Sequence, residues 1–476
     1  MRRGGGRWAD IFMAQAILIL GAGPTGLGAA RRLHELGHSD WQLLEAAGEA
    51  GGLSSSFVDG KGFTWDIGGH VQFSHYEYFD RAMEEYLGRD GWLHHQRESW
   101  VWMRDRFIPY PFQNNIRRLP AEDLEKCLAG LVDISRAGTV KPANFREWIL
   151  ATFGPGLAEV FMFPYNFKVW AFPPEMMNAV WVGERVAVTD LKRVLHNLVH
   201  GKDDLSWGPN NTFQFPLHGG TGAIWRAAAA RLPQERLRYG TTVTGIDLER
   251  REVTTSAGEK LGYERLISTL PLKELIRLSG QTRLEEAAHR GLLSSSSNIF
   301  GIGLRGKPQP HLSSKCWMYF PEDNCPFYRV TVFSNYSPNN VPDITQHWSL
   351  MAEVSESSHK PVEHALLMEQ VIEGLLATKL IESREDIIST WSYRAGYGYP
   401  TPGLERDAAL AEILPVFETN GVYSRGRFGL WKYEVSNQDH SFMQGVEVVE
   451  HLLNGAVEMT AQNPNLANSR KHPWPV

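Results

Sequence analysis

The sequence predicts an α/β fold in which a parallel sheet is interrupted by a helical segment and by a second, mixed or antiparallel sheet. Three observations support this. A short apolar strand at 16–20 leads through a glycine-rich turn into a helix. Residues 119–200 have a mostly helical pattern, and strand-like stretches return at 239–246 and 265–270. Because strands separated by an insertion can share one sheet, we expect a discontinuous first domain.

The opening strand ends in a G-x-G-x-x-G turn. Gly21 permits the tight turn, Gly23 lets the backbone approach a pyrophosphate at the helix N-terminus, and Gly26 lets the helix lie close to the strand. Gly37 is expected to end this helix. The next strand ends in Glu45, about twenty residues beyond the glycines, where the hydroxyls of a ribose are held. This pattern predicts a Rossmann-like dinucleotide-binding domain, against the alternative of an ordinary glycine-rich turn.

Two glycine doublets follow the acidic residue, at 51–52 and 68–69. Each suits a backbone that passes close to the far half of a bound cofactor. Two such doublets resemble the large glutathione-reductase-like group of flavoproteins, which bind FAD in extended form. FAD is therefore favoured over NAD, and the alternative is that the first doublet only terminates a loop.

The chain is expected to divide into four parts. These are a disordered extension (1–13), a discontinuous FAD-binding domain (14–84, 213–275 and 421–462), a helical substrate domain (112–205), and a sheet domain that forms the substrate and flavin site (85–111 and 276–420). Two local expectations accompany this division. Thr189 is expected to cap the helix that follows it, and one C-terminal helix to span roughly 441–462.

Composition is typical of a large soluble enzyme. The chain has 476 residues, 42% hydrophobic and 21% charged, enough for two or three domains. The net charge is −6 and the 48 Lys and Arg are scattered, which argues against nucleic acid as a partner. No apolar run approaches the twenty or so residues that insert into a membrane. Three cysteines without a C-x-x-C pair fit a reducing, cytoplasmic setting, and no cluster has metal-site spacing, so no metal is expected.

An arginine within an aromatic strand indicates an anion site. The strand over 327–333 is expected to place four residues on one face, namely Phe327, Arg329, Thr331 and Phe333. An arginine on such a face is costly unless an anion meets it. With Arg185 from a distant segment, Arg329 could clamp a diphosphate through bidentate contacts. The alternative for each arginine is an ordinary salt bridge, for example between Arg185 and Glu184.

Two further segments, 109–115 and 164–170, mix aromatic residues with amides. Such a mixture suits a planar base with several hydrogen-bonding edges, such as uracil, although turns rich in Pro and Asn have a similar composition. Together with 426–442, these segments resemble the UDP-galactopyranose mutases, specifically their eukaryotic-type branch. The resemblance runs from about Ile17 to the C-terminal helix. Its motifs are long, namely Tyr110–Asn115, Pro164–Ala171, Gly183–Val186, Phe320–Arg329 and Asn437–Phe442.

The resemblance implies where the flavin binds. The implied FAD-binding residues are Gly21, Gly23, Pro24, Thr25, Gly26, Glu45, Gly52, Leu53, Ser54, Gly68, Gly69, His70, Val243, Asn437, Gln438 and Ser441. The isoalloxazine is expected against 68–70, with the backbone of His70 near flavin N5. Residues 437–441 are expected to hold the flavin from the C-terminal side.

The resemblance also implies the substrate site. Uridine is expected among Tyr110, Gln113, Phe161, Asn166 and Trp170, the diphosphate among Arg185, Arg329, Tyr319, Tyr399 and Tyr433, and galactose near Trp317, Arg427, His75 and Asn210. NADPH is the expected reductant, at Arg97 and Ser99.

The implied reaction is a redox-neutral interconversion of UDP-galactopyranose and UDP-galactofuranose. N5 of the reduced flavin attacks the anomeric carbon and displaces UDP, and the sugar opens and recloses as a five-membered ring before UDP returns. Positive charge retains the leaving diphosphate, and the catalytic residues implied are Arg185, Arg329, His70 and Arg427.

Two departures from the family pattern leave room for a nucleotide or sugar other than UDP and galactose. Phe163 stands where the resemblance leads us to expect an arginine, and the stretch after 337–340 is short. A pyranose–furanose mutase for another nucleotide sugar is therefore one alternative. An FAD-dependent oxidoreductase resembling amine oxidases is a less favoured one, because its pocket would be apolar and lack paired arginines. A degenerate flavoprotein that only binds nucleotide sugars would require loss of the flavin contacts. The oligomeric state stays open.

Overall fold

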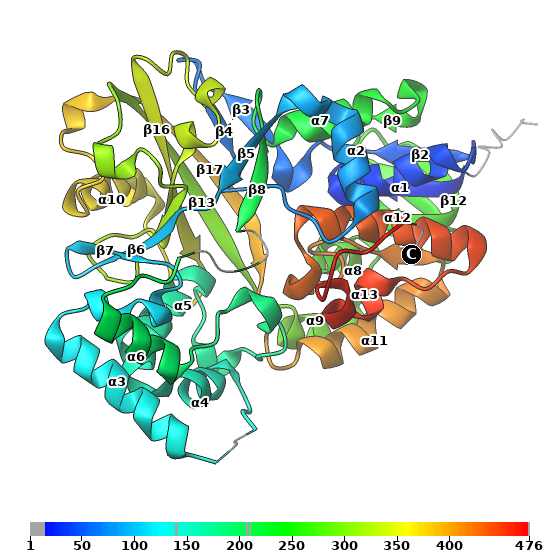
Figure 1. The fold of residues 1–476 in the computed structure, drawn as a ribbon. Coiled ribbons are helices and arrows are strands. Elements are labelled where there is room, and N and C mark those ends of the chain that lie inside the picture. The colour runs from blue at the N-terminus through cyan, green and yellow to red at the C-terminus, as the bar shows by residue number, and fades with distance from the viewer. Residues whose placement is uncertain (1–14, 139–140, 206–207, 209–210, 475–476) are drawn as a thin grey trace, which may run out of the picture.

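The computed structural model describes residues 15–138, 141–205, 208 and 211–474. The expected disordered extension at 1–13 lies outside these residues. Figure 1 shows two sheets side by side, with a group of helices below the second sheet. The architecture confirms the α/β fold with a mixed second sheet. Among the described helices, none combines the length and apolar character needed to cross a bilayer.

The first sheet draws strands from three distant parts of the chain. Its order is β10-β11-β12-β1-β2-β9, and β18 also pairs with β12. The strands are β1 (Gln15–Leu20), β2 (Trp41–Leu44), β9 (Leu237–Arg238), β10 (Val243–Asp247), β11 (Glu252–Thr255), β12 (Lys260–Ser268) and β18 (Val422–Ser424). β1 runs parallel to β2 and β12, and β12 runs parallel to β18. Strand β18, more than 150 positions further along the chain than β12, therefore joins this sheet beside β12.

Helices cover both faces of this sheet. One layer contains α1 (Pro24–Glu35), α2 (Glu77–Leu87), α7 (Gly222–Ala230) and α12 (Gln438–Asn454), and the other contains α8 (Leu272–Leu278), α9 (Glu285–Gly291) and α11 (Arg406–Thr419). In Figure 1 the late helix α12 lies beside the early helix α1. Glycines make this approach possible, because a Cβ on Gly445 would lie 1.9 Å from the carbonyl oxygen of Thr25 and one on Gly28 would lie 2.2 Å from that of Phe442.

The second sheet has the order β17-β13-β16-β15-β14-β6-β7. Its strands are β6 (Ser99–Met103), β7 (Arg106–Pro109), β13 (Ser294–Arg305), β14 (Trp317–Tyr319), β15 (Arg329–Val332), β16 (His347–Glu356) and β17 (Ile387–Pro400). All pairs are antiparallel except β14 with β6, which is parallel. One face packs on α10 (His364–Ala377), and two small pairs complete the strands, β3 (Ser56–Val58) with β4 (Thr64–Asp66) and β5 (Trp92–Gln96) with β8 (Thr212–Pro216).

The helical region consists of α3 (Ala121–Arg136), α4 (Phe145–Leu157), α5 (Phe163–Trp170) and α6 (Leu191–His200), packed around one apolar core. The expected cap of α6 was wrong by one residue. Asp190, not Thr189, is the N-cap, and its carboxylate accepts a hydrogen bond from Lys192 N at 3.0 Å. Asp and Thr are both good caps, and the backbone rather than the residue type decides between neighbours.

The expected single C-terminal helix is divided in the structure. α12 ends before Gly455, which adopts a left-handed conformation with φ of +69°, and two short helices follow, α13 (Met459–Gln462) and α14 (Pro464–Ala467). A glycine just beyond an apolar helical pattern is a common stop signal, and this one lies within the expected helix.

Candidate functional site

A cavity of about 670 Å³ joins the glycine-rich turn after β1 to the inner face of the second sheet. Most of the residues implied by the resemblance line it, namely Gly21, Gly23, Pro24, Thr25, Glu45, Gly52, Leu53, Ser54, Gly68, Gly69, His70, Arg97, Tyr110, Arg185, Trp317, Tyr319, Arg329, Tyr399, Arg427, Tyr433, Asn437, Gln438 and Ser441. Segments separated by more than four hundred residues therefore meet around one space.

The remaining implied residues lie elsewhere. Gly26, Ser99, Gln113, Phe161, Asn166, Trp170 and Val243 are not part of the cavity wall, and Asn210 lies outside the described residues. Val243 packs at the start of β10 with the apolar core behind the first sheet. The carbonyl of Ser99 accepts a hydrogen bond from Tyr110 N at 3.1 Å, so Ser99 holds the neighbouring strand segment.

The residues expected to hold uracil form a packed layer beside the cavity. Phe161 stacks on Phe112 at 4.2 Å, and Asn166 Nδ2 donates to the carbonyl of Met162 at 2.8 Å. The ring of Trp170 lies 4.7 Å from that of Tyr433. The amide of Gln113 is likewise used within the protein, because it donates a hydrogen bond to the carbonyl of Ala187. Of the expected set, Tyr110 is the member that reaches the cavity wall.

The three glycines of the first turn have distinct surroundings. Gly21 has φ of +101°, and a Cβ on Gly26 would lie 1.9 Å from the carbonyl oxygen of Gly21. In contrast, a Cβ on Gly23 would meet nothing nearer than 3.9 Å. The helix α1 begins after Gly23 with no side-chain cap. Open space and free N–H groups at a helix N-terminus fit the pyrophosphate of a dinucleotide.

The acidic residue after β2 is held by the backbone. Glu45 Oε2 accepts a hydrogen bond from Ala22 N at 2.6 Å, and Oε1 accepts one from Ala47 N at 2.8 Å. These contacts fix the carboxylate at the cavity wall, at the end of the strand next to β1. The position suits contact with ribose hydroxyls.

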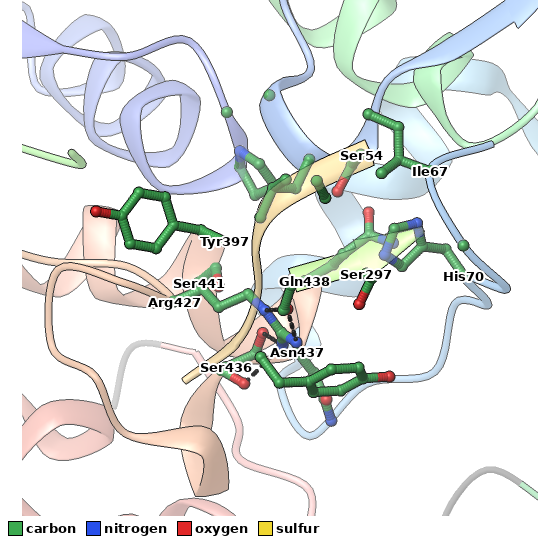
Figure 2. Close-up of a pocket in the computed structure, with 18 of the residues that line it drawn as sticks. Ser54, Ile67, His70, Ser297, Tyr397, Arg427, Ser436, Asn437, Gln438 and Ser441 are labelled. Atoms are coloured by element: carbon green, nitrogen blue, oxygen red, sulfur yellow. Dashed lines mark hydrogen bonds between the residues drawn. The ribbon is translucent and has the colours of Figure 1, made fainter. Parts of the chain in front are cut away.

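Figure 2 shows part of the cavity wall, where His70 and Tyr397 lie on opposite sides of the view and Arg427 between them. Gly68, with φ of +95°, shapes the turn before His70. Burial, with the nearby charge of Arg427, lowers the pKa of His70 to about 4. A lowered pKa means that His70 itself adds no positive charge to this part of the cavity at pH 7.

Arg329 has an anionic partner that the sequence did not reveal. The Glu353 carboxylate accepts hydrogen bonds from Arg329 Nε and Nη2, each at 2.8 Å. The strand also begins later than expected, at Arg329, so Phe327 packs instead with the core beneath α10. Val330 belongs to that same core, and Thr331 lies on the face of Arg329.

Two further arginines have no carboxylate partner within the described residues. Arg185 Nη2 donates to the carbonyl of Glu434 at 2.6 Å, while its Nη1 is buried with no partner in the part of the chain that the structure describes. Arg427 donates to the carbonyl of Gly398 at 2.9 Å and to Ser436 Oγ at 2.8 Å. The Glu184 alternative for Arg185 concerns a side chain outside those described.

Phenol rings lie between these cations. The guanidinium of Arg185 lies 5.7 Å from the ring centre of Tyr433, and that of Arg427 lies 5.0 Å from the ring centre of Tyr399. Of the residues that the structure describes, five arginines and two carboxylates line the cavity. This excess of fixed positive charge in a partly buried space favours an anionic ligand.

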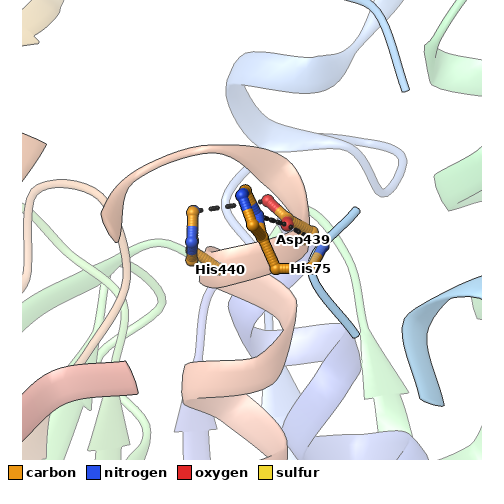
Figure 3. A group of neighbouring side chains, drawn as sticks. All are labelled: His75, Asp439 and His440. Atoms are coloured by element: carbon orange, nitrogen blue, oxygen red, sulfur yellow. Dashed lines mark hydrogen bonds and ion pairs between the residues drawn. The ribbon is translucent and has the colours of Figure 1, made fainter. Parts of the chain in front are cut away.

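His75, expected beside galactose, lies in a buried trio with Asp439 and His440, shown in Figure 3. The Asp439 carboxylate accepts hydrogen bonds from His75 Nδ1 at 2.9 Å and from His75 N at 3.0 Å. The His75 and His440 rings stack with centres 4.9 Å apart. The three residues approach closely enough to hold a metal ion, a grouping hidden in the sequence by a separation of 364 positions. His75 does not line the cavity. Its hydrogen bonds to Asp439 connect the segment before α2 to the first turn of α12.

The trio predicts a measurable acid sensitivity. Burial lowers the pKa of His440 to about 3, so the unfolded chain, with an ordinary histidine pKa, binds the extra proton. The contribution of neutral His440 to the free energy of unfolding is complete above about pH 6.5 and is lost as the pH falls toward 3. By pH 5 the free energy of unfolding is lower by about 2 kcal/mol. His440→Gln is expected to flatten the fall in the urea unfolding midpoint between pH 7 and pH 5. The exposed His218→Gln is the control and should keep the steep dependence; an equally steep dependence in both variants would contradict this account.

Comparisons with known proteins agree with this geometry. The family of flavin containing amine oxidoreductases matches residues 24–426. A crystal structure of reduced UDP-galactopyranose mutase is similar to this chain with 50% sequence identity and a TM-score of 0.93, over 97% of this chain and 98% of that one.

More distant structures share the fold alone. A putative protoporphyrinogen oxidase from an Exiguobacterium species is 16% identical with a TM-score of 0.68, over 92% of this chain and 98% of that one. A fatty acid isomerase from P. acnes is 13% identical with a TM-score of 0.61, over 92% of this chain and 99% of that one.

Proposed function

Since the chain belongs to the flavin containing amine oxidoreductases and, within them, to the UDP-galactopyranose mutases, we propose that it interconverts UDP-galactopyranose and UDP-galactofuranose. One observation carries the proposal: Arg185, Arg329 and Arg427 surround the same cavity that begins at the dinucleotide-binding turn. A site that binds a cofactor and an anionic substrate together needs this continuity.

The cavity wall fits FAD. The open space at Gly23 and the uncapped start of α1 suit the pyrophosphate, Glu45 suits the ribose, and 68–70 and 437–441 would enclose the isoalloxazine. When bound in its reduced form, FAD supplies the nucleophile for the anomeric carbon of the sugar. The protein's own contribution is binding, orientation and charge.

The arginines are proposed to hold UDP throughout the reaction. Among the described residues Arg185 Nη1 lies buried without a partner, and Arg329 donates to Glu353 through Nε and Nη2, which leaves its Nη1 for a ligand. A guanidinium fixed in this way stabilises the negative charge that develops as the diphosphate leaves. It also keeps the diphosphate in place for its return, which a redox-neutral isomerisation requires.

The identity of the nucleotide rests on two observations. Phe163, the departure from the family pattern, is not part of the cavity wall, and the guanidinium of Arg146 lies 4.4 Å from its ring centre. The loss of a positive charge at 163 is therefore outside the proposed diphosphate site. The departure at 163 therefore gives no reason to exclude a UDP-sugar from this cavity. The excess of arginines in the wall likewise disfavours an oxidase for apolar amines.

The finer assignments are part of the same proposal. Arg97 lines the cavity between the rings of Tyr110 and Trp317, 5.3 and 5.8 Å from their centres, which suits contact with the NADPH reductant. The motifs at 110–115 and 437–442 support the eukaryotic-type branch. Three buried free cysteines support a cytoplasmic location.

The test uses purified protein loaded with FAD and kept free of oxygen. Reduced protein incubated with UDP-galactofuranose is expected to form UDP-galactopyranose, and oxidised protein is not. Product is measured by chromatography of the nucleotide sugars. A yellow, reducible protein that leaves this substrate unchanged in both states would contradict the proposed reaction while leaving the fold and cofactor intact.

A further inference from the structure

Glu353, on β16, receives four hydrogen bonds from three residues. Its Oε1 accepts from Arg329 Nε at 2.8 Å and Gly69 N at 3.1 Å, and its Oε2 accepts from Arg329 Nη2 at 2.8 Å and Tyr328 OH at 2.7 Å. The residue is only 2% exposed. Both oxygens of this buried carboxylate therefore have two donors each, which is the condition for keeping a charge out of water.

These donors belong to two different sides of the cavity. Gly69 lies in the 68–70 segment, where the flavin is proposed to bind, whereas Arg329 lies on β15, where the diphosphate is proposed to bind. The contact is tight as well as polar. A Cβ on Gly69 would lie 3.0 Å from Thr331 Oγ1, 3.3 Å from Glu353 Oε1 and 3.7 Å from Arg329 Cζ. Movement of the arginine or of the segment therefore displaces the other.

Cross-strand register places the pair together. Arg329 and Glu353 are directly opposite each other on the antiparallel strands β15 and β16. Burial opposes the carboxylate charge, but Arg329 and the other donors hold the pKa of Glu353 below its usual range. The carboxylate is therefore charged at neutral pH, and it uses two of the three guanidinium nitrogens of Arg329.

We propose that Glu353 is a positioning residue that couples the 68–70 segment to Arg329, so that the flavin side and the diphosphate side of the cavity are held in one arrangement. This inference rests on the proposed function for the identity of the two ligands. Its consequence is specific: removing the carboxylate changes the environment of the bound flavin and the affinity for UDP together, although Glu353 is assigned to neither ligand.

Glu353→Gln tests the coupling, because the amide keeps the size of the side chain but presents an N–H group to N–H donors. The dissociation constant for UDP is expected to rise about tenfold or more. The visible spectrum and the midpoint potential of bound FAD are expected to change in the absence of UDP. Glu353→Asp keeps the charge but shortens the side chain, and both readouts are expected to shift less.

Glu458→Gln is the matched control. Glu458 is also 2% exposed and accepts hydrogen bonds from Arg425 Nε and Nη2 at 2.5 and 2.6 Å, away from the cavity wall. It is expected to lower the unfolding midpoint while leaving UDP affinity and the flavin readouts unchanged. If neither folded Glu353 variant alters the flavin readouts, or if only UDP affinity changes, the coupling is wrong.

The readouts separate this inference from the proposed function. Binding of UDP and the properties of bound FAD are measured without turnover. Wild-type protein that binds FAD but not UDP would reject the proposed substrate, and the flavin readouts of the Glu353 variants would still decide whether this carboxylate positions the 68–70 segment.

Discussion

Gly23→Val is expected to abolish FAD binding in a chain that still folds. Gly23 has φ of −78° and ψ of −176°, an extended conformation that valine adopts readily, and apart from its chain neighbours no described residue has an atom nearer than 3.9 Å to its missing Cβ. The added methyl groups would occupy the space proposed for the pyrophosphate. The dissociation constant for FAD is expected to rise at least about 100-fold, equivalent to about 3 kcal/mol. FAD content by visible absorbance and the urea midpoint of the apoprotein measure the two effects.

Two other glycines are the controls for this experiment. Gly48→Ala introduces a Cβ into open space and should change neither readout. Gly26→Ala places a Cβ 1.9 Å from the carbonyl oxygen of Gly21, so it is expected to destabilise the fold itself by about 1–3 kcal/mol. A Gly23→Val protein that retains stoichiometric FAD would show that the cofactor does not lie over this turn.

Arg185→Ala is expected to lower kcat/KM for UDP-galactofuranose by about 100- to 1,000-fold, the usual effect of losing a fixed cation at a developing negative charge. The spectrum of bound FAD should stay unchanged, because Arg185 donates to the carbonyl of Glu434 and to Asn468 Oδ1 rather than to the 68–70 segment. Initial rates with reduced enzyme and the absorbance spectrum measure the two quantities.

Arg146→Ala is the control, since Arg146 also lies over an aromatic ring but outside the cavity wall. Its kcat/KM should stay close to that of the wild type. Wild-type kcat/KM in Arg185→Ala would remove Arg185 from the proposed diphosphate site. Arg185 and Arg329 differ in one respect: Arg329 and Gly69 of the 68–70 segment bond to the same carboxylate, Glu353, and Arg185 does not.

Local signals in the sequence were sufficient for the fold class and for the glycine-rich turn and acidic residue of the cavity wall, whereas most other wall residues were predicted from the family resemblance. The glycine turn after β1 and the acidic residue after β2 follow from backbone requirements that operate over a few residues. Arg329 could be singled out because a charged residue among aromatic ones is unusual in a core, and Arg185 was named with it as a second arginine that could clamp a diphosphate. Their presence in one wall depends on packing of the helical region against the second sheet.

The partners of these residues could not be read from the sequence. Glu353 meets Arg329 through strand register, across 24 positions, and Asp439 meets His75 across 364. Neither separation carries a periodic signal. Because the sequence does not reveal such distant partners, His75 was expected beside the sugar, whereas in the structure it bonds to Asp439 at the start of α12. Phe327 was misplaced because the strand begins two residues later than its composition indicates.

The most direct test of the central claim is the number of NADPH molecules consumed for each UDP-galactopyranose formed. The measurement is made without oxygen, with limiting NADPH and excess UDP-galactofuranose, by following NADPH absorbance and product together. A redox-neutral mutase is expected to form many product molecules for each NADPH, which serves only to reduce the flavin once. One NADPH consumed for each product, or NADPH consumed with no change in the sugar, would contradict the account and indicate an oxidoreductase on the same fold.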